Sequence, residues 1–388
     1  MAKAIQGLTG LNVRGINRRL VLSWLYTAGG GTKHQLVREL NMSLSTVDQN
    51  LKELENAGLI VQQGFTDSTG GRPARRYGVN PRYKCAVGIG ILKGSVHLCA
   101  VDLNGSLLSS RELPLPFEDS EAFFAGLGQG FKAFLSDNQI AASSLLPVNA
   151  AVQGLPSADG KEIAFGVLLH NQGQQADRLS AKLGTEVKWV HDSAAAAFYE
   201  LHEHPGLNNA VLFLLNRNFG GALIIGGQVV SGSGGWAGTL EHICLNPEGT
   251  RCYCGSRGCA ETVLSADALR QQAGLEIPEF FARLRAGDHD CREVWSRYLN
   301  TLALLMRNTL PLVDGELILC GYLVPFMTED DLDTLHRLIN ANLPFDFARE
   351  RLSAGSSGDL SPALGAALMS VDAYLKAEVL TSGSFERI

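Results

Sequence analysis

Residues 242–261 read His-Ile-Cys-Leu-Asn-Pro-Glu-Gly-Thr-Arg-Cys-Tyr-Cys-Gly-Ser-Arg-Gly-Cys-Ala-Glu, and this stretch carries side chains that could hold a metal ion. One imidazole and three thiolates are the ligands of a tetrahedral structural zinc site. Four protein ligands leave no position for water, so such an ion would brace the loop rather than catalyse. Ordinary buried thiols or a disulfide are the alternatives, but three cysteines within eight positions, led by a histidine, favour a metal. The predicted structural zinc ligands are His242, Cys252, Cys254 and Cys259.

The length and composition indicate a globular protein of two or three domains. The chain has 388 residues, 45% of them hydrophobic and 19% charged, and a chain of this length exceeds one ordinary domain. There is no apolar run of about 18 residues and no signal sequence at the start, so we predict a cytoplasmic protein without membrane insertion. Four further cysteines lie in apolar stretches and are predicted to be buried free thiols in a reducing compartment: Cys85, Cys99, Cys291 and Cys320.

The charge is distributed unevenly along the chain. Residues 1–80 hold ten Lys or Arg against five Asp or Glu, whereas the remainder holds 23 against 34. A small basic module on an acidic body suggests that the module binds a polyanion. An ordinary solvated charged surface is the alternative, but it explains the clustering less well.

The basic module has the pattern of a helix-turn-helix. Apolar residues recur at helical spacing over residues 11–28, and Gly29-Gly30-Gly31 ends that helix. Thr32 is a suitable N-cap for a helix over 33–40, and Ser43 for a third over 44–57. Two short helices joined by a tight turn predict this motif.

A strand over 59–65, a turn over 66–73 and a returning strand over 74–79 predict a wing beside the third helix. The third helix would present side chains that read base edges. An arginine at the tip of the wing would enter a narrow A/T-rich minor groove. The remaining basic side chains would contact phosphates. Asp48 does not fit this surface unless it accepts from a cytosine amine or points away. A winged helix that binds only protein is the alternative, which the basic excess disfavours. The predicted DNA-binding residues are Ser45, Thr46, Gln49 and Asn50 for bases, Arg72 for the minor groove, and Lys33, Arg75 and Arg76 for phosphates.

The rest of the chain has a repeated α/β pattern. Strand patterns begin at Cys85, Val96 and Leu107, and a second set of three begins near Asn209, each set followed by helices. This order predicts a duplicated α/β architecture with a cleft between two lobes.

At this point the sequence resembles the repressor branch of the ROK family (repressors, open reading frames and kinases). The resemblance rests on Val13–Arg19 with the winged helix, on Ser68-Thr69-Gly70-Gly71-Arg72-Pro73, and on His242–Glu261. It implies an actin-like or hexokinase-like two-lobed body, a homodimer or homotetramer, palindromic operators in double-stranded DNA, and release by a sugar or a partner protein. The expected domains are 1–80, then a first lobe over 81–193 completed by a C-terminal helix over 371–388, and a second lobe over 194–370.

The phosphate-binding positions depart from those of the family's kinases. Gly88-Ile89-Gly90-Ile91-Leu92-Lys93-Gly94 lacks the metal-site aspartate that the resemblance implies, and Asn216–Gly221 and Cys320-Gly321-Tyr322 replace glycine-rich turns. Phosphoryl transfer depends on positioning and charge neutralisation, so we predict that the chain is not an enzyme.

The resemblance also implies a sugar site at Asp192, His242 and Glu261. Thr239 replaces a sugar-binding glutamate and His191 an asparagine, which would alter or weaken ligand choice, and Glu241, displaced by one position, is placed to compensate. From the residues alone, capping of the helix that follows is the less favoured alternative for Asp192, and Glu261 could equally stabilise a helix dipole.

These patterns predict a DNA-binding transcriptional regulator, a repressor of carbohydrate-utilisation genes that a sugar or related metabolite releases. One alternative is a ROK-type sugar kinase with a regulatory DNA-binding end. Another is a regulator controlled by a protein partner.

Overall fold

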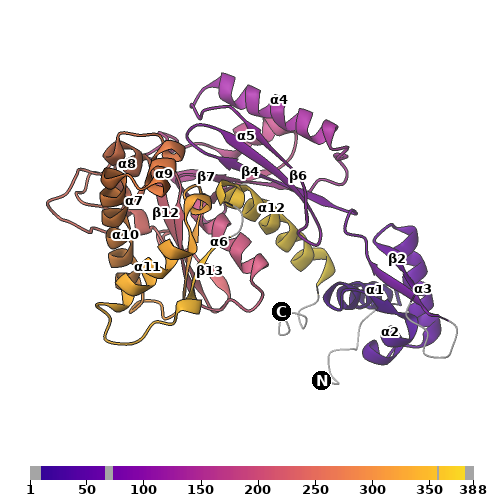
Figure 1. Cartoon of the computed structure of the whole chain (residues 1–388). Coiled ribbons are helices and arrows are strands. Elements are labelled where there is room, and N and C mark those ends of the chain that lie inside the picture. The colour runs from indigo at the N-terminus through magenta and orange to yellow at the C-terminus, as the bar shows by residue number, and fades with distance from the viewer. Residues whose placement is uncertain (1–9, 66–72, 356–357, 381–388) are drawn as a thin grey trace.

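The computed structural model describes residues 10–65, 73–355 and 358–380. Figure 1 shows a small N-terminal unit beside a larger body that contains two sheets. The predicted wing turn, including Arg72, lies outside the described residues apart from Pro73. Within the described ranges, no helix is long and apolar enough to cross a membrane.

The N-terminal unit is a winged helix-turn-helix, as the sequence predicts. Thr32 and Gln35 form a capping box, and the Ser43 hydroxyl accepts a hydrogen bond from the Thr46 backbone, so both helices begin at their predicted caps. The three strands form an antiparallel sheet in the order β1-β3-β2. The elements are α1 (Gly10–Thr27), β1 (Gly31–Thr32), α2 (Lys33–Leu40), α3 (Leu44–Asn56), β2 (Ile60–Phe65) and β3 (Arg75–Val79).

The first sheet of the body has five strands in the order β10-β7-β4-β5-β6. β4, β5 and β6 form an antiparallel meander, and β7 and β10 add to it in parallel. Helices α4 and α5 cover one face, where the alternate β4 residues Val87, Ile89 and Ile91 are buried. The elements are β4 (Cys85–Ile91), β5 (Val96–Asp102), β6 (Leu107–Leu113), α4 (Glu121–Asp137), β7 (Val148–Val152), α5 (Ala176–Leu183) and β10 (Val187–His191), with a hairpin of β8 (Leu155–Pro156) and β9 (Ile163–Phe165).

The second sheet repeats this topology in the order β13-β12-β11-β14-β15, which confirms the predicted duplication. Five helices cover one face, and α6 (Asp192–Glu203) packs on the other. The elements are β11 (Ala210–Leu215), β12 (Phe219–Ile225), β13 (Gln228–Val230), η1 (Leu240–His242), α7 (Glu261–Leu264), α8 (Ala266–Ala273), α9 (Ile277–Ala286), α10 (His289–Thr309), β14 (Glu316–Cys320), η2 (Val324–Phe326), α11 (Glu329–Asn340), η3 (Arg349–Arg351), β15 (Leu352–Ala354) and η4 (Gly358–Leu360).

Helices α6 and α12 (Ser361–Tyr374) pack against each other between the two sheets. The contact is close because glycines remove side chains from it. A Cβ atom on Gly365 would lie 1.7 Å from the carbonyl oxygen of Ala195 in α6, and one on Gly88 of β4 would lie 2.0 Å from that of Ala363. Backbone approaches this short are open only to glycine. Gly365 therefore lets α12 pack closely on α6, and Gly88 lets it pack closely on β4.

The predicted C-terminal helix is displaced in sequence. It was expected over 371–388, but α12 begins at Ser361, with Pro362 in its first turn, and continues into the π-helical turn η5 (Leu375–Val379). Because α12 packs on β4, β5 and β7, residues 361–370 lie on the first sheet rather than with the second lobe. Residues 381–388 lie outside the described residues.

The N-terminal unit contacts η5, the π-helical turn that directly follows α12. The Arg19 guanidinium donates to the carbonyl oxygens of Lys376, Ala377 and Leu380 at 3.2, 2.6 and 2.9 Å. These are the terminal carbonyls that helix geometry leaves without backbone donors, and a cation there also favours the helix dipole. Buried side chains of α1 and α12, including Leu22 and Leu368, belong to one hydrophobic cluster. Figure 1 shows α12 running from between the sheets toward α1.

The four cysteines expected to be buried free thiols are free and buried. Burial raises the pKa of Cys85 to about 11 and that of Cys99 to about 12. Both thiols therefore stay protonated near neutral pH, as unreactive core residues do.

Candidate functional site

The four predicted metal ligands come together in one cluster after η1. The ligand atoms of His242, Cys252, Cys254 and Cys259 all lie within 4.8 Å of one another. The loop can fold this tightly because Gly258 has a φ of +64°, and a Cβ atom there would lie 1.6 Å from the carbonyl oxygen of Asn246.

The spacing of the cluster fits a tetrahedral metal ion. Zinc–sulfur bonds of about 2.3 Å place two thiolates of a tetrahedron about 3.8 Å apart. The Sγ atoms of Cys254 and Cys259 are 3.7 Å apart, and the Cys252 Sγ lies 3.9 Å from the His242 Nδ1. A disulfide requires a bond of about 2.05 Å, so the geometry matches shared coordination rather than a disulfide. The cluster could therefore hold a metal such as zinc.

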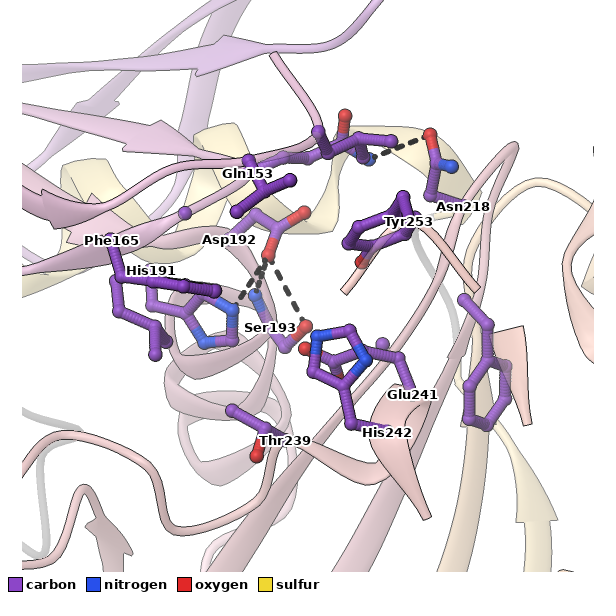
Figure 2. A pocket seen from close by; sticks show the side chains of 16 residues that line it. Gln153, Phe165, His191, Asp192, Ser193, Asn218, Thr239, Glu241, His242 and Tyr253 are labelled. Atoms are coloured by element: carbon purple, nitrogen blue, oxygen red, sulfur yellow. Dashed lines mark hydrogen bonds and ion pairs between the residues drawn. The ribbon is translucent and has the colours of Figure 1, made fainter. Parts of the chain in front are cut away.

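A cavity opens beside this cluster, between the first sheet and the elements of the second half (Figure 2). Acidic and amide side chains line its interior, together with aromatic rings. His242 lines the cavity as well as belonging to the cluster, so the metal loop forms part of the wall. The lining residues are Gln153, Gly154, Leu155, Phe165, Val167, Leu168, His191, Asp192, Ser193, Asn218, Phe219, Gly220, Thr239, Glu241, His242 and Tyr253.

Asp192 is the first residue of α6 and lies at the centre of this cavity. Its Oδ1 accepts from the backbone N–H and the hydroxyl of Ser193, at 2.7 and 3.2 Å, and the His191 Nε2 lies 3.4 Å away. His191 holds the N-cap position, so Asp192 supports the first turn and also faces the cavity. Burial raises the pKa of Asp192, and burial also lowers the pKa of His191, which keeps that ring neutral near pH 7.

Glu241 is the residue whose importance the sequence reasoning underrated. It is 7% exposed, and its Oε2 has no hydrogen-bond partner in the described part of the chain. Burial, with Asp192 and Glu261 nearby, raises its pKa to about 8. The Thr239 hydroxyl donates to the Trp236 carbonyl at 2.9 Å. The only signal for Glu241 in the sequence was its displacement by one position from the expected glutamate.

Glu261 does not line the cavity, although the sequence placed it among the ligand-binding residues. Its carboxylate accepts from the Asn218 Nδ2 at 2.8 Å and from the Phe219 backbone N–H at 2.6 Å. Burial raises its pKa to about 7, and these hydrogen bonds oppose the rise. Glu261 therefore braces the β11–β12 turn that forms one wall.

The expected base-reading residues divide into two groups on α3. Ser45 and Gln49 are exposed and Thr46 is half-buried. Asn50, predicted to face outward, is instead buried, and its Nδ2 donates to the Thr46 carbonyl at 2.8 Å. The prediction for Asn50 is wrong because that position lies one turn from Val47 on the apolar face of the helix.

Two of the three basic side chains expected to bind phosphates form bonds within the protein instead. Lys33 donates to Asp48, and Lys52 pairs with the same carboxylate at 2.8 Å. These bonds hold the pKa of Asp48 at about 2 and explain how a carboxylate is accommodated on this helix. Arg76 donates to the Gly29 carbonyl at 3.0 Å, whereas Arg75 is exposed.

The three positions that replace the kinase glycines also meet in space. The Asn216 Oδ1 accepts from the Tyr322 backbone N–H at 2.7 Å, and this amide occupies the space beside Gly321. Side chains of this chain thus fill the β11–β12 turn at the point where the resemblance implies a backbone cradle for phosphates.

Comparisons with known proteins agree with this architecture. The sequence profile of the ROK family matches residues 86–373. Over 267 residues the chain is 23% identical to the DNA-binding transcriptional dual regulator NagC of Escherichia coli K12, covering 67% of this chain and 65% of NagC. It is 28% identical over 247 residues to an N-acetylmannosamine kinase of Escherichia coli, covering 61% of this chain and 81% of that kinase.

Solved structures show the same fold. A ROK family transcriptional regulator, described as a homologue of the Escherichia coli MLC protein, superposes with a TM-score of 0.73 at 19% identity, covering 95% of this chain and 99% of that one. A ROK family glucokinase from Streptomyces griseus superposes with a TM-score of 0.65 at 20% identity, covering 74% of this chain and 98% of the glucokinase chain. The chain belongs to the ROK family, because its profile matches most of the sequence.

Proposed function

We propose that this chain is a DNA-binding transcriptional regulator, acting as a repressor of carbohydrate-utilisation genes, and that a sugar or related metabolite in the cleft releases it from DNA. Two features support the proposal: a winged helix precedes a ROK body, and a matched relative is a DNA-binding regulator. The observation that carries it is the contact of Arg19 with the end of α12. That contact links the cleft to the winged helix.

The route from cleft to winged helix runs through two packed helices. Asp192 begins α6, and α6 meets α12 where Ala195 lies against Gly365. The far end of α12 receives Arg19 from α1. A ligand that binds one relative orientation of the sheets more tightly shifts the population toward it. Because packed helices move as rigid bodies, α12 would carry that shift to the winged helix and change the spacing between half-sites.

We propose that the cysteine and histidine cluster holds structural zinc. The metal supplies a rigid tetrahedral bracket when bound. His242 and Tyr253 lie on the cavity wall within this loop, so a fixed loop keeps them positioned for a ligand. Gln153, Asn218 and Glu241 would accompany Asp192 in contacting that ligand.

On DNA, we propose that Ser45, Thr46 and Gln49 read base edges and that Arg75 contacts phosphates. Arg72 stays a predicted minor-groove contact. The target is a palindromic A/T-rich operator, matched by a homodimer or homotetramer in the cytoplasm. The proposed domains are residues 1–80, a first lobe over 81–193 with α12, and a second lobe over the intervening residues.

A sugar kinase is the second candidate, because kinases are among the relatives and Asp192 lies buried in the cleft. We propose that the chain does not transfer phosphoryl groups. Gly88 and Gly90 on β4 pack against α12, and neither supplies the acid that the kinases use. A coupled ATPase assay with a hexose panel tests this: turnover that Asp192→Asn removes would establish a kinase.

The main test of the proposed function is selection of bound fragments from genomic DNA at fixed salt. We expect enrichment of a two-fold symmetric A/T-rich site with half-sites about one or two helical turns apart. Binding without sequence preference, lost uniformly as salt rises, would refute a sequence-specific regulator.

A further inference from the structure

The wall of the cleft has buried hydrogen-bond acceptors that lack donors. Two buried acceptors in its wall have no donor in the described chain: Oε2 of Glu241 and Oε1 of Gln153. These residues are 7% and 8% exposed. A buried polar atom without a partner is costly, so both atoms favour a hydrogen-bonding partner supplied by whatever fills the cavity.

Three donors in the same wall are already used by the protein. The Gln153 amide donates to the Asn218 Oδ1 at 3.4 Å, and the Asn218 amide donates to Glu261 at 2.8 Å. The Ser193 hydroxyl donates to Asp192 at 3.2 Å. The side chains of Gln153, Asn218 and Ser193 therefore donate their hydrogen bonds to other groups of the protein.

The charge of the wall has the same bias. Asp192 and Glu241 both line the cavity, and none of the sixteen lining residues is a lysine or an arginine. Figure 2 shows both side chains at the centre of the view, on opposite sides of Ser193. Asp192 has the His191 ring as its basic neighbour, 3.4 Å away, and the Glu241 Oε2 has no partner in the described residues. A cation that also donates hydrogen bonds would stabilise both carboxyl groups.

We propose that the ligand of this cleft is an amino sugar with a free, protonated amine, and that Glu241 is the residue that selects it. An ammonium group brings three donors and a positive charge to the carboxylates, and the sugar hydroxyls supply donors for Asp192 and Gln153. N-acetylation would remove the charge and leave one N–H. A phosphorylated sugar would add negative charge beside two carboxyl groups. This inference rests on the proposed function and names the ligand class of the same site.

Calorimetric titration of the zinc-loaded, full-length protein tests the proposal, with glucosamine, galactosamine, mannosamine, their N-acetyl forms and the neutral hexoses at one pH. We expect at least one free amine to bind about tenfold or more tightly than its N-acetyl form. Glu241→Gln should abolish that preference. Glu248→Gln, the same substitution at an exposed position of the metal loop, should leave the preference intact.

Several results would overturn the proposal. They are tighter binding of an N-acetylated, neutral or phosphorylated sugar, an unchanged preference in Glu241→Gln, and no binding of any sugar. Operator binding is measured separately without ligand. A protein that binds its operator and no amine keeps the proposed regulator and loses this inference, with a protein partner as the effector. Failure to bind an operator refutes the regulator itself, whatever the titrations show. Thermal melting of the Glu241→Gln variant without ligand checks its fold.

Discussion

The two halves of the body share one topology and differ in what they insert into it. In each half a three-stranded meander is extended by two parallel strands. The connection between the meander and the first parallel strand is residues 114–147 in the first half, with one helix. In the second half it is residues 231–315, with the metal cluster, Glu241 and four helices. The two sheets are alike, whereas this one connection holds the cysteine and histidine cluster and Glu241 of the cavity wall.

The halves also differ in how they meet their neighbours. The first sheet carries α12, whose far end receives Arg19 of the winged helix. The second sheet carries α6, which begins at Asp192. The first half therefore contacts the winged helix, and the helix of the second half begins at a residue of the cavity wall, with α6 and α12 packed between them.

The largest expected effect concerns the cluster that only the second half has. Replacing Cys252 and Cys259 by Ser should abolish metal binding and destabilise the protein by several kcal/mol, lowering Tm by about 10 °C, because the proposed zinc would hold the loop together. Elemental analysis and calorimetry measure this. Cys244→Ser is the matched control, since Cys244 is exposed and lies outside the cluster. An equal loss of metal and of thermal stability in Cys244→Ser and in the Cys252 and Cys259 variant would contradict a specific metal site.

The next effect concerns the seam that the first half makes with α12. Gly88→Ala should destabilise the protein by about 3 kcal/mol, because the new methyl group would overlap backbone atoms of Ala363 and Ala367. Gly94→Ala is the control, since no atom lies within 4 Å of a Cβ atom there. Chemical denaturation compares the two, and a tolerated Gly88→Ala would show that the helix can move away from the sheet.

A smaller effect is expected where the first half meets the winged helix. Arg19→Ala should cost about 2 kcal/mol, since three carbonyls lose a charged donor. It should also weaken ligand-induced release from operator DNA while preserving operator affinity. Arg18→Ala serves as the control, because its pair with Glu53 is on the surface at 3.6 Å and such pairs contribute about 0–1 kcal/mol. Normal release in Arg19→Ala would reject α12 as the route.

The smallest effect is a pH dependence carried by the second half alone. Burial raises the pKa of Glu241 from 4.5 to about 8, so the folded state holds a proton that the unfolded state has lost. The free energy of unfolding therefore falls as the pH rises from the unfolded-state pKa of 4.5 to the folded-state pKa of about 8. Between about pH 7 and pH 8.5 the wild type should lose about 1–2 kcal/mol relative to Glu241→Gln. Parallel slopes in denaturation experiments would show that Glu241 is already paired.

The sequence by itself determined the elements whose signals are local. Caps at Thr32 and Ser43 lie within three residues of the groups they satisfy, so α2 and α3 begin where predicted. The metal ligands are concentrated in one loop, and strand periodicity revealed both meanders. These features depend on a few neighbouring residues, which a single sequence displays.

Only the tertiary structure decided which side chains face the cleft and which face inward. Glu261 accepts a hydrogen bond from Asn218 in the β11–β12 turn, and Asn50 donates one to a carbonyl of its own helix. Asp48 is paired with Lys33. The orphaned oxygen of Glu241 and the placement of Arg19 on α12 arise between segments far apart in the chain. Such contacts depend on how the sheets and helices pack against each other, and a short stretch of sequence does not show which distant segments will pack together.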